Sequence, residues 1–200
     1  MITRKKFDFL KEKYGKHASW AIWADVGERP KSNIGDMSVL DPDLQKDLLS
    51  KLNPEAILVA LNFAEDIDHE SWENFHKYRP QATDYKTRFA LRDTPLWGAY
   101  MTDVLKDYPE KDSAKVNSHL KDHPDLEAAN IKRFREEIRD IGSTDPILIA
   151  FGNIVYEILR RNMPEFKIAK IPHYAHYMSK EKYRESVKDV WSEHFHSVEK

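Results

Sequence analysis

The stretch that decides the fold covers residues 146–177 and reads PILIAFGNIVYEILRRNMPEFKIAKIPHYAHY. Its first six residues are apolar and end at Gly152, a helix-like segment follows, and a strand-like run, KIAKI, then ends before two histidines. A continuous apolar run of strand length is typical of a strand buried on both faces. The stretch therefore predicts a strand, a return helix and a second strand, with His173 and His176 just beyond it.

Three further strands are expected earlier in the chain, at residues 19–25, 56–61 and 99–103, and the second of them is apolar throughout. Helical patterns separate the strands. From the N-terminus onwards the sequence predicts an opening helix ended by Gly15, a helix from Asp41 with Leu44, Leu48 and Leu52 on one face, short helices at 69–78 and 84–94, a long helix at 125–141 and a closing helix after Ser179. Alternating strands and helices predict a three-layer α/β/α fold with a mostly parallel central sheet. We expect residues 1–200 to form a single domain, because no linker or internal repeat interrupts them.

The composition excludes several kinds of chemistry. The chain has no cysteine, which rules out disulfides, thiolate metal sites, cysteine nucleophiles and cysteine-ligated iron–sulfur clusters. Charged residues make up 33% of the chain but nearly cancel, to a net charge of −2, so a nucleic-acid partner would require a local basic face. No signal peptide is apparent and no apolar run approaches the roughly 20 residues of a membrane span, so a soluble cytoplasmic protein is expected.

The expected strand ends carry polar residues suited to chemistry. In an open α/β sheet, ligands bind at the carboxyl ends of the strands. Those ends are occupied by four short segments: residues 61–63 with Asn62, residues 102–103 with Asp103, residues 152–153, and residues 172–173 with His173. We therefore expect the functional site at this edge of the sheet.

The order and spacing of these four segments, over roughly residues 56–190, resemble the uracil-DNA glycosylase superfamily. ALNFA (60–64) corresponds to the family's Gly-X-Asn/Asp-Pro motif, but Gly and Pro are absent. TDVLK (102–106) corresponds to its Thr-Asn-hydrophobic-hydrophobic-Lys segment, with Asp103 in place of Asn. ILIAFGNIVYEIL corresponds to its strand, glycine and helix, and IPHYAHY to its His-Pro-Ser type loop without Pro-Ser. The resemblance implies a uracil-DNA glycosylase-like fold, DNA as partner, and excision of a damaged or deaminated base without a cofactor or metal.

The resemblance also implies roles for individual residues. Asn62 would position the catalytic water through its amide oxygen, although an amide cannot deprotonate that water, and Glu65 or Asp66 could supply the missing carboxylate. His173 would donate to the carbonyl of the departing base, with His176 as the alternative. The aromatic residues that could stack on a flipped base are Phe63, Phe75 and Tyr78. The alternative roles are structural: Asn62 and His173 would then satisfy backbone groups at the strand ends.

Among the differences from the superfamily motifs, Asp103 has the clearest chemical consequence. An ionised carboxylate only accepts hydrogen bonds, so it would oppose O4 of uracil and suit an exocyclic amino group better. This residue therefore argues against plain uracil specificity. The alternative is that Asp103 caps a helix beginning at Val104.

Basic residues surround the His173 loop. Between residues 158 and 188 there are eight Lys or Arg and three acidic residues. Lys170, Lys180 and Lys182 are the candidates to contact DNA phosphates. The pair His173 and His176 lacks an obvious further ligand for zinc, so no metal site is expected.

Two other functions remain open from the sequence. A protein of this fold could bind a nucleic acid or nucleotide without cleaving it. It could also bind a protein partner through the aromatic-rich segment 63–97.

Overall fold

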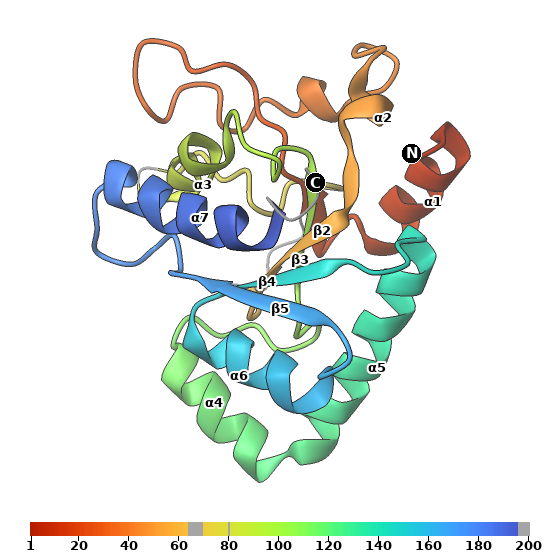
Figure 1. The fold of residues 1–200 in the computed structure, drawn as a ribbon, viewed down its shortest axis with the longest axis vertical. Helices are drawn as coiled ribbons and strands as arrows, with labels where there is room; N and C mark the ends of the chain where they lie inside the picture. Colours follow the sequence, from red (N-terminus) through yellow and green to blue (C-terminus); the bar gives the residue numbers. More distant parts are fainter. Residues whose placement is uncertain (64–69, 80, 196–200) are drawn as a thin grey trace.

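The computed structural model of the chain describes residues 1–63, 70–79 and 81–195. At its centre is a five-stranded sheet with the strand order β1-β3-β2-β4-β5 (Figure 1). The strands are β1 (Ala18–Trp20), β2 (Asn53–Ala60), β3 (Ala99–Asp103), β4 (Ile147–Phe151) and β5 (Lys167–Ile171). Only β1 pairs in the antiparallel direction, with β3, whereas the other neighbours pair in parallel. The expected mostly parallel central sheet is confirmed.

Helices cover both faces of this sheet. One face carries α1 (Arg4–Tyr14), α4 (Ser113–Asp122), α5 (Pro124–Ile141) and α6 (Asn153–Asn162), and the other carries α3 (Asp84–Leu91) and α7 (Lys180–Phe195). The connection from β1 to β2 contains the short 3-10 helix η1 (Met37–Leu40) and α2 (Leu48–Lys51). The protein is thus a mixed α/β fold with a helical layer on each side of the sheet.

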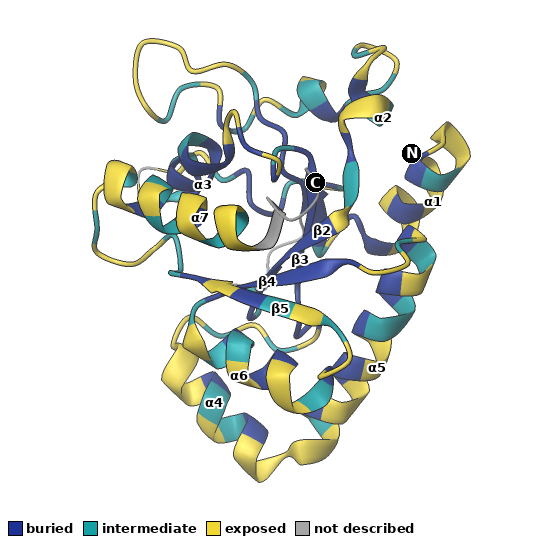
Figure 2. Cartoon of the chain, viewed as in Figure 1, coloured by how far each residue is buried: buried dark blue, intermediate teal, exposed yellow. Residues whose placement is uncertain are grey.

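The buried strands explain the continuous apolar runs. Ile57 and Val59 of β2 point into the core under α1, α5 and α6, while Leu58 and Ala60 point into the core under α3 and α7. Because both faces are covered, every position of the run must be apolar. Figure 2 shows the inner strands as the most buried part of the chain and the outer sides of the helices as exposed.

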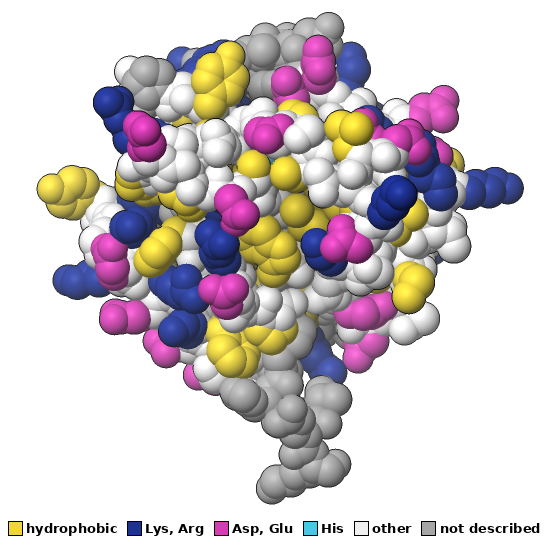
Figure 3. All heavy atoms as spheres, turned by 90° about the horizontal axis from the view of Figure 1, so that it is seen from above, with side chains coloured by type: hydrophobic (Ala, Val, Ile, Leu, Met, Phe, Trp, Pro, Cys, Tyr) yellow, Lys and Arg dark blue, Asp and Glu magenta, His cyan; other side chains and the backbone are white. Residues whose placement is uncertain are grey.

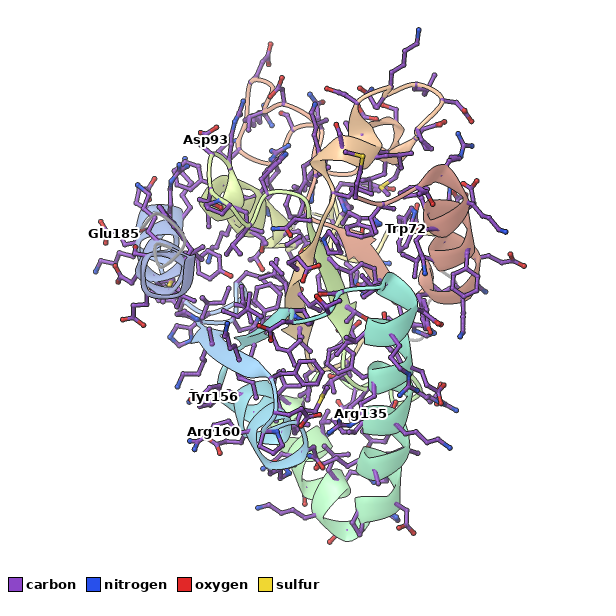
Figure 4. The ribbon with its side chains drawn as sticks, turned by 45° about the vertical axis from the view of Figure 1, so that its right-hand side comes forward. Trp72, Asp93, Arg135, Tyr156, Arg160 and Glu185 are labelled. Atoms are coloured by element: carbon purple, nitrogen blue, oxygen red, sulfur yellow. The ribbon has the colours of Figure 1, made fainter. Side chains whose placement is uncertain are left out.

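Aromatic rings fill the space between α1 and the sheet. Trp72 lies there (Figure 4), with its ring centroid 5.7 Å from that of Phe7 and 6.3 Å from that of Trp20. Trp20 meets Tyr100 of β3 edge to face at 4.9 Å. Trp72, Trp20 and Tyr100 are almost completely buried, so they anchor the N-terminal helix to the sheet.

Two of the predicted helices differ from the structure, and one helix was not predicted. The helix expected from Asp41 is reduced to α2, because the Asp41 side chain accepts from the backbone of Asp43 in a turn and Leu44 stays 65% exposed. Residues 70–79 form an irregular loop. Conversely, α4 lies in a segment that reads as charged and turn-rich; Asp112 caps it by accepting from the backbone of Ala114.

No helix in the described part of the chain combines the length and the apolar character needed to cross a bilayer.

Candidate functional site

A cleft of about 590 Å³ opens at the carboxyl ends of the four parallel strands. Asn62, Asp103, Gly152 and His173, which follow or end β2, β3, β4 and β5 respectively, all line it. The central strands β2 and β4 are neighbours, but the chain leaves β2 towards β3 on one side and leaves β4 towards β5 on the other. Such a switch point in strand order creates a crevice at the carboxyl edge, which is the usual place for a ligand in an α/β sheet.

Asn62 is held by the loop that follows β3. Its amide nitrogen donates to the carbonyl oxygens of Phe63, Tyr108 and Glu110, at 2.8, 2.8 and 2.9 Å. The nitrogen therefore serves the backbone, as the structural alternative for this residue expects. Within the described residues no donor contacts the amide oxygen of Asn62, which leaves it able to accept from a water in the cleft.

Asp103 lies at the bottom of the cleft and is 2% exposed. One carboxylate oxygen accepts from the side-chain amide of Asn74 at 2.8 Å, and the same amide also donates to the carbonyl of His17. Burial raises the pKa of Asp103 to about 6 against the opposing effects of Lys106 and Asn74. Near pH 6 the carboxyl group is therefore divided between an acceptor-only form and a protonated form that can also donate.

The proposed capping role of Asp103 is wrong. No helix begins at Val104, because the backbone continues to pair with the end of β2: Val104 N donates to Ala60 O and Leu105 N to Leu61 O, at 2.8 and 2.9 Å. The next helix starts only at Ser113. This extended backbone directs the Asp103 side chain into the cleft instead of onto a helix end.

A buried network of charged and polar side chains lies next to Asp103, on the side away from the cleft. The Lys106 ammonium group lies 2.6 Å from the carbonyl oxygen of Asp103 and 2.8 Å from a carboxylate oxygen of Glu137 on α5. The other Glu137 oxygen accepts from the hydroxyls of Tyr100 and Thr102, at 2.8 and 2.9 Å. All these side chains are buried, so the end of β3 is fixed by an ion pair with neutral hydrogen bonds around it.

His173 lines the opposite part of the cleft. Its Nδ1 accepts from the backbone N–H of Ala175 at 3.1 Å, so in the neutral imidazole the proton sits on Nε2. The ring stacks on Tyr174 at 4.4 Å and meets Phe151 edge to face at 6.2 Å. Burial, helped by the nearby His176, lowers the pKa of His173 to about 4, so at neutral pH the residue is an uncharged donor. His176 itself is exposed and lies outside the cleft lining.

Two of the three candidate stacking residues reach the cleft. Phe63 lines it and stacks on His17 at 4.8 Å, and Phe75 lines it with its ring 6.5 Å from that of Phe151. Tyr78 does not reach it: the side chain is 77% exposed and borders a separate hollow. Phe75 is therefore the buried aromatic wall of the cleft.

The loop carrying Phe75, residues 70–79, is strained and strongly anchored. Trp72 and Phe75 adopt φ values of 73° and 70°, which bulky residues rarely do and which cost on the order of 1–3 kcal/mol each. The backbone N–H of Trp72 donates to Gly15 O at 2.8 Å, and the indole N–H of Trp23 donates to Phe75 O at 3.2 Å. Tertiary contacts thus override the helical pattern of this segment, and they hold Phe75 in one position.

The end of β4 contributes backbone N–H groups to the wall of the cleft. Gly152 has a φ of 88°, and a Cβ there would lie 3.8 Å from the Cβ of His173. The N-terminus of α6 follows directly, without a side-chain cap, and Asn153, Ile154 and Val155 line the cleft. Free N–H groups and the positive end of the helix dipole favour negative charge developing at this wall.

Three charged residues of the cleft were not among the sequence candidates. Glu110, Lys77 and Lys111 line its wall. Glu110 lies beside Asn62, since its carbonyl accepts from the Asn62 amide and its N–H donates to Phe63 O at 3.0 Å. Glu65 and Asp66, the carboxylates proposed from sequence, fall outside the described residues. No sequence signal marks Glu110, which follows Asn62 by 48 positions.

The three candidate phosphate-binding lysines are dispersed. Lys170 is next to the cleft, where its ammonium group donates to the Asn153 side chain at 2.8 Å. Lys180 lies over the Phe89 ring, 4.4 Å from its centroid, and borders another pocket. Lys182 is exposed, and its backbone N–H donates to the Ser179 hydroxyl oxygen at 3.2 Å. The expected basic surface is therefore not a single patch around the cleft.

Among the described residues, no group of three or more His, Asp or Glu side chains is arranged to hold a metal ion. Comparison with protein-family models, with curated proteins and with solved structures finds no match for this chain.

Proposed function

We propose that this protein is a DNA base glycosylase of uracil-DNA glycosylase-like fold that flips a damaged or deaminated base into the cleft and hydrolyses its N-glycosidic bond. The observation that carries the proposal is the meeting of Asn62, Phe75, Asp103 and His173 in one cleft from four separate segments. A base needs these functions together: a stacking wall, a polar reader of its edge, a donor to its carbonyl and a site for water.

In this proposal His173 stabilises the departing base. Negative charge develops on a base carbonyl as the bond breaks, and the Nε2–H of a neutral imidazole can donate to it. The α6 N-terminus on the adjacent wall favours the same charge. Because the pKa of His173 is lowered to about 4, the donor is in this form at any pH above about 5.

Asp103 reads the edge of the base, and its protonation decides which edges fit. In the ionised form it accepts from an exocyclic amino group or a ring N–H. In the protonated form it also donates, and can then match a carbonyl such as O4 of uracil. Base preference should therefore change with pH near the Asp103 pKa of about 6.

The water is assigned to Asn62 and Glu110. The amide oxygen of Asn62 accepts a hydrogen bond from the water. The Glu110 carboxylate on the same wall, one oxygen of which accepts from the Asp112 backbone N–H at 2.9 Å, is the base that takes the water proton. An amide alone cannot do this, so Glu110→Gln should slow excision while leaving DNA binding unchanged.

The test is a panel of duplex and single-stranded oligonucleotides, each carrying one lesion, incubated at pH 5.5 and pH 8 and followed by alkaline cleavage of abasic sites. Strand cleavage on at least one lesion, lost in His173→Ala, supports the proposal. Intact strands across the panel at both pH values would refute it.

A second candidate, base or nucleotide binding without cleavage, is favoured by one observation. The Asn62 amide nitrogen is engaged with three carbonyls, so this residue has an evident structural task. Tight binding of a lesion oligonucleotide without strand cleavage would assign this function. The partner-binding alternative has less support, because among the described residues of segment 63–97 Tyr78 is the one strongly exposed aromatic side chain.

A further inference from the structure

A second pocket, of about 370 Å³, lies on the side of the sheet covered by α3 and α7. Its walls come from three segments that are distant in sequence: the loop 26–30, the exposed side of α3, and the first turns of α7. These elements lie together at the upper left in Figure 1. We refer to it as the basic pocket.

The lining of the basic pocket is strongly cationic. Five of its side chains are positively charged, and one, Glu28, is negatively charged. The cations are Arg29, Arg88, Arg92, Lys180 and Arg184. Figure 3 shows Lys and Arg side chains interspersed with acidic ones over the face of the molecule seen from above.

Two of these arginines are fixed by carbonyl oxygens. Arg88 is 2% exposed and donates to three carbonyls of the segment 24–32, at 2.7 to 3.0 Å. Arg184 donates to the carbonyls of Phe89 and Arg92, at 2.9 and 3.0 Å. Carbonyls satisfy N–H donors without cancelling the positive charge. Burial and the charge of Arg92 accordingly lower the pKa of Arg88.

Two further cations converge on one ring. Lys180 and Arg184 both lie over the Phe89 ring, at 4.4 and 5.3 Å from its centroid. They are four positions apart on a helix, where like charges repel. Such a placement costs folding free energy unless an anion compensates it.

The nearby carboxylates lie at the rim of the pocket and not inside it. Asp25 contacts Arg92 at 2.8 Å, Asp93 lies 3.9 Å from Arg184, and Glu181 lies 3.7 Å from Lys180. These carboxylates are 90%, 79% and 61% exposed. Figure 4 shows Asp93 at the outer end of α3. Exposed pairs of this kind contribute little, so the centre of the pocket keeps its positive charge.

We propose that the basic pocket binds a phosphate group. The fixed guanidinium groups of Arg88 and Arg184 supply positive charge. The side chain of Arg29 can offer the planar N–H donors that phosphate oxygens match, and Lys180 adds a mobile point charge. The aromatic rings of Tyr85 and Phe89 on the same wall suit a phosphate attached to a larger, partly apolar molecule. This inference does not depend on the proposed function of the cleft.

The test measures the unfolding temperature of the full chain in potassium phosphate against potassium chloride of equal ionic strength. A saturable rise of several degrees is expected at about a hundred times the dissociation constant. Arg29→Ala and Lys180→Ala should each weaken phosphate binding roughly tenfold or more. Both side chains can be removed without breaking a carbonyl contact of Arg88 or Arg184. Lys188→Ala, an exposed lysine about two turns further along α7 and outside the pocket lining, is the matched control and should leave binding unchanged.

Two further arms distinguish the sources of the phosphate. A 5′-mononucleotide that binds more tightly than inorganic phosphate, and loses affinity in Arg29→Ala and Lys180→Ala, assigns a small phosphorylated ligand. A 20-base-pair duplex that loses affinity in the same variants, with a salt slope lower by about 0.9 per removed contact, assigns the DNA backbone. Absence of a saturable phosphate effect, or an effect of equal size in both variants and the native protein, overturns the proposal.

Discussion

Asp103 and His173 face each other across one cleft, but the protein holds them in opposite ways. Asp103 ends a central strand, is almost completely buried, and rests on the Lys106–Glu137 ion pair. His173 lies in a half-exposed loop after the edge strand β5, and one backbone N–H, that of Ala175, fixes its ring tautomer. The wall of the cleft at Asp103 therefore belongs to the protein core, whereas the wall at His173 is a surface loop that packs against the core.

Because of this difference, substitutions at the two walls of the cleft should have different effects, one mainly on stability and the other mainly on the proposed reaction. Substitutions under Asp103 should act mainly on the free energy of unfolding, because they disturb buried charges. Substitution of His173 should act mainly on the reaction, because few contacts depend on its ring. The predictions below test that separation, in order of decreasing expected effect.

The largest effect is expected at the ion pair under Asp103. Glu137→Ala leaves the buried Lys106 ammonium group without its countercharge, and we expect a loss of about 3–5 kcal/mol in the free energy of unfolding, measured by urea denaturation. Glu136→Ala, the neighbouring and partly exposed position, should change stability by less than about 0.5 kcal/mol.

The double variant Lys106→Met, Glu137→Leu sharpens this prediction. It removes both charges at once, so it should recover most of the stability lost in Glu137→Ala. Equal losses in the single and double variants would show that packing at Glu137 and its bonds to the Tyr100 and Thr102 hydroxyls, and not its charge, carry the effect.

His173→Ala should have the opposite effect, with a large loss of excision and little loss of stability. We expect excision to fall roughly 10²- to 10³-fold, as for loss of one donor to a developing negative charge, with a stability change of less than about 1 kcal/mol. The measurement is single-turnover cleavage on the best lesion of the panel. His176→Ala is the control, since this exposed residue lies outside the cleft. A stability loss of several kcal/mol in His173→Ala would remove the contrast between the two sides.

Asp103→Asn should change base preference and its pH dependence. Uracil excision by the native protein should be weak at pH 8 and should rise roughly tenfold to a hundredfold as the pH falls through about 6, because protonation turns Asp103 into a donor. The Asn variant should excise uracil at both pH values, and this gain should vanish when His173→Ala is added. Pronounced uracil release by the native protein at pH 8, unchanged in the variant, would show that Asp103 does not read the base.

The same variant has a stability signature. Burial raises the folded-state pKa of Asp103 from 3.8 to about 6, so the folded state binds more protons than the unfolded state between these values. The contribution of Asp103 to stability is therefore most favourable below pH 4 and is lost as the pH rises through 6. Asp103→Asn should stabilise the protein by about 1–3 kcal/mol at pH 8, with a gain that shrinks towards pH 4.

The smallest effect is expected at Asn62. Asn62→Asp places a carboxylate where the superfamily motif allows one, yet we expect no faster excision. The amide nitrogen bonds three carbonyls, and a carboxylate oxygen would repel them. We expect a loss of about 1–2 kcal/mol in the free energy of unfolding. Faster cleavage without destabilisation would show that the 108–110 loop does not depend on Asn62.

Local pattern was sufficient for the parts of the fold that depend on burial alone. The apolar runs at β2 and β4 predict central strands because a strand covered on both faces can carry little else. The helix stripe of Ile131, Phe134, Ile138 and Ile141 is buried as its spacing predicts. In contrast, α4 has only Val116 and Leu120 to bury, so its segment looks like an exposed turn region.

Contacts between side chains that are distant in the sequence could not be predicted from the sequence. Strand ends alone indicated Asn62, Asp103 and His173, since topology brings such ends to one edge. Asn74 escaped detection because it reaches Asp103 only through a loop of unusual backbone conformation, although the segment reads as a helix. Lys106 and Glu137 lie 31 positions apart, and only the packing of α5 on β3 pairs them.

The position of β2 in the sheet has a consequence for how the protein is made. This central strand leaves the ribosome early, but its neighbour β4 follows about 90 residues later, a delay of roughly 5–20 s at the usual rates of synthesis. β3 is made within that interval, but the edge of β2 that pairs with β4 stays without its partner until the interval ends. Nascent chains of this protein are therefore exposed to edge-to-edge pairing at β2 until β4 has been made.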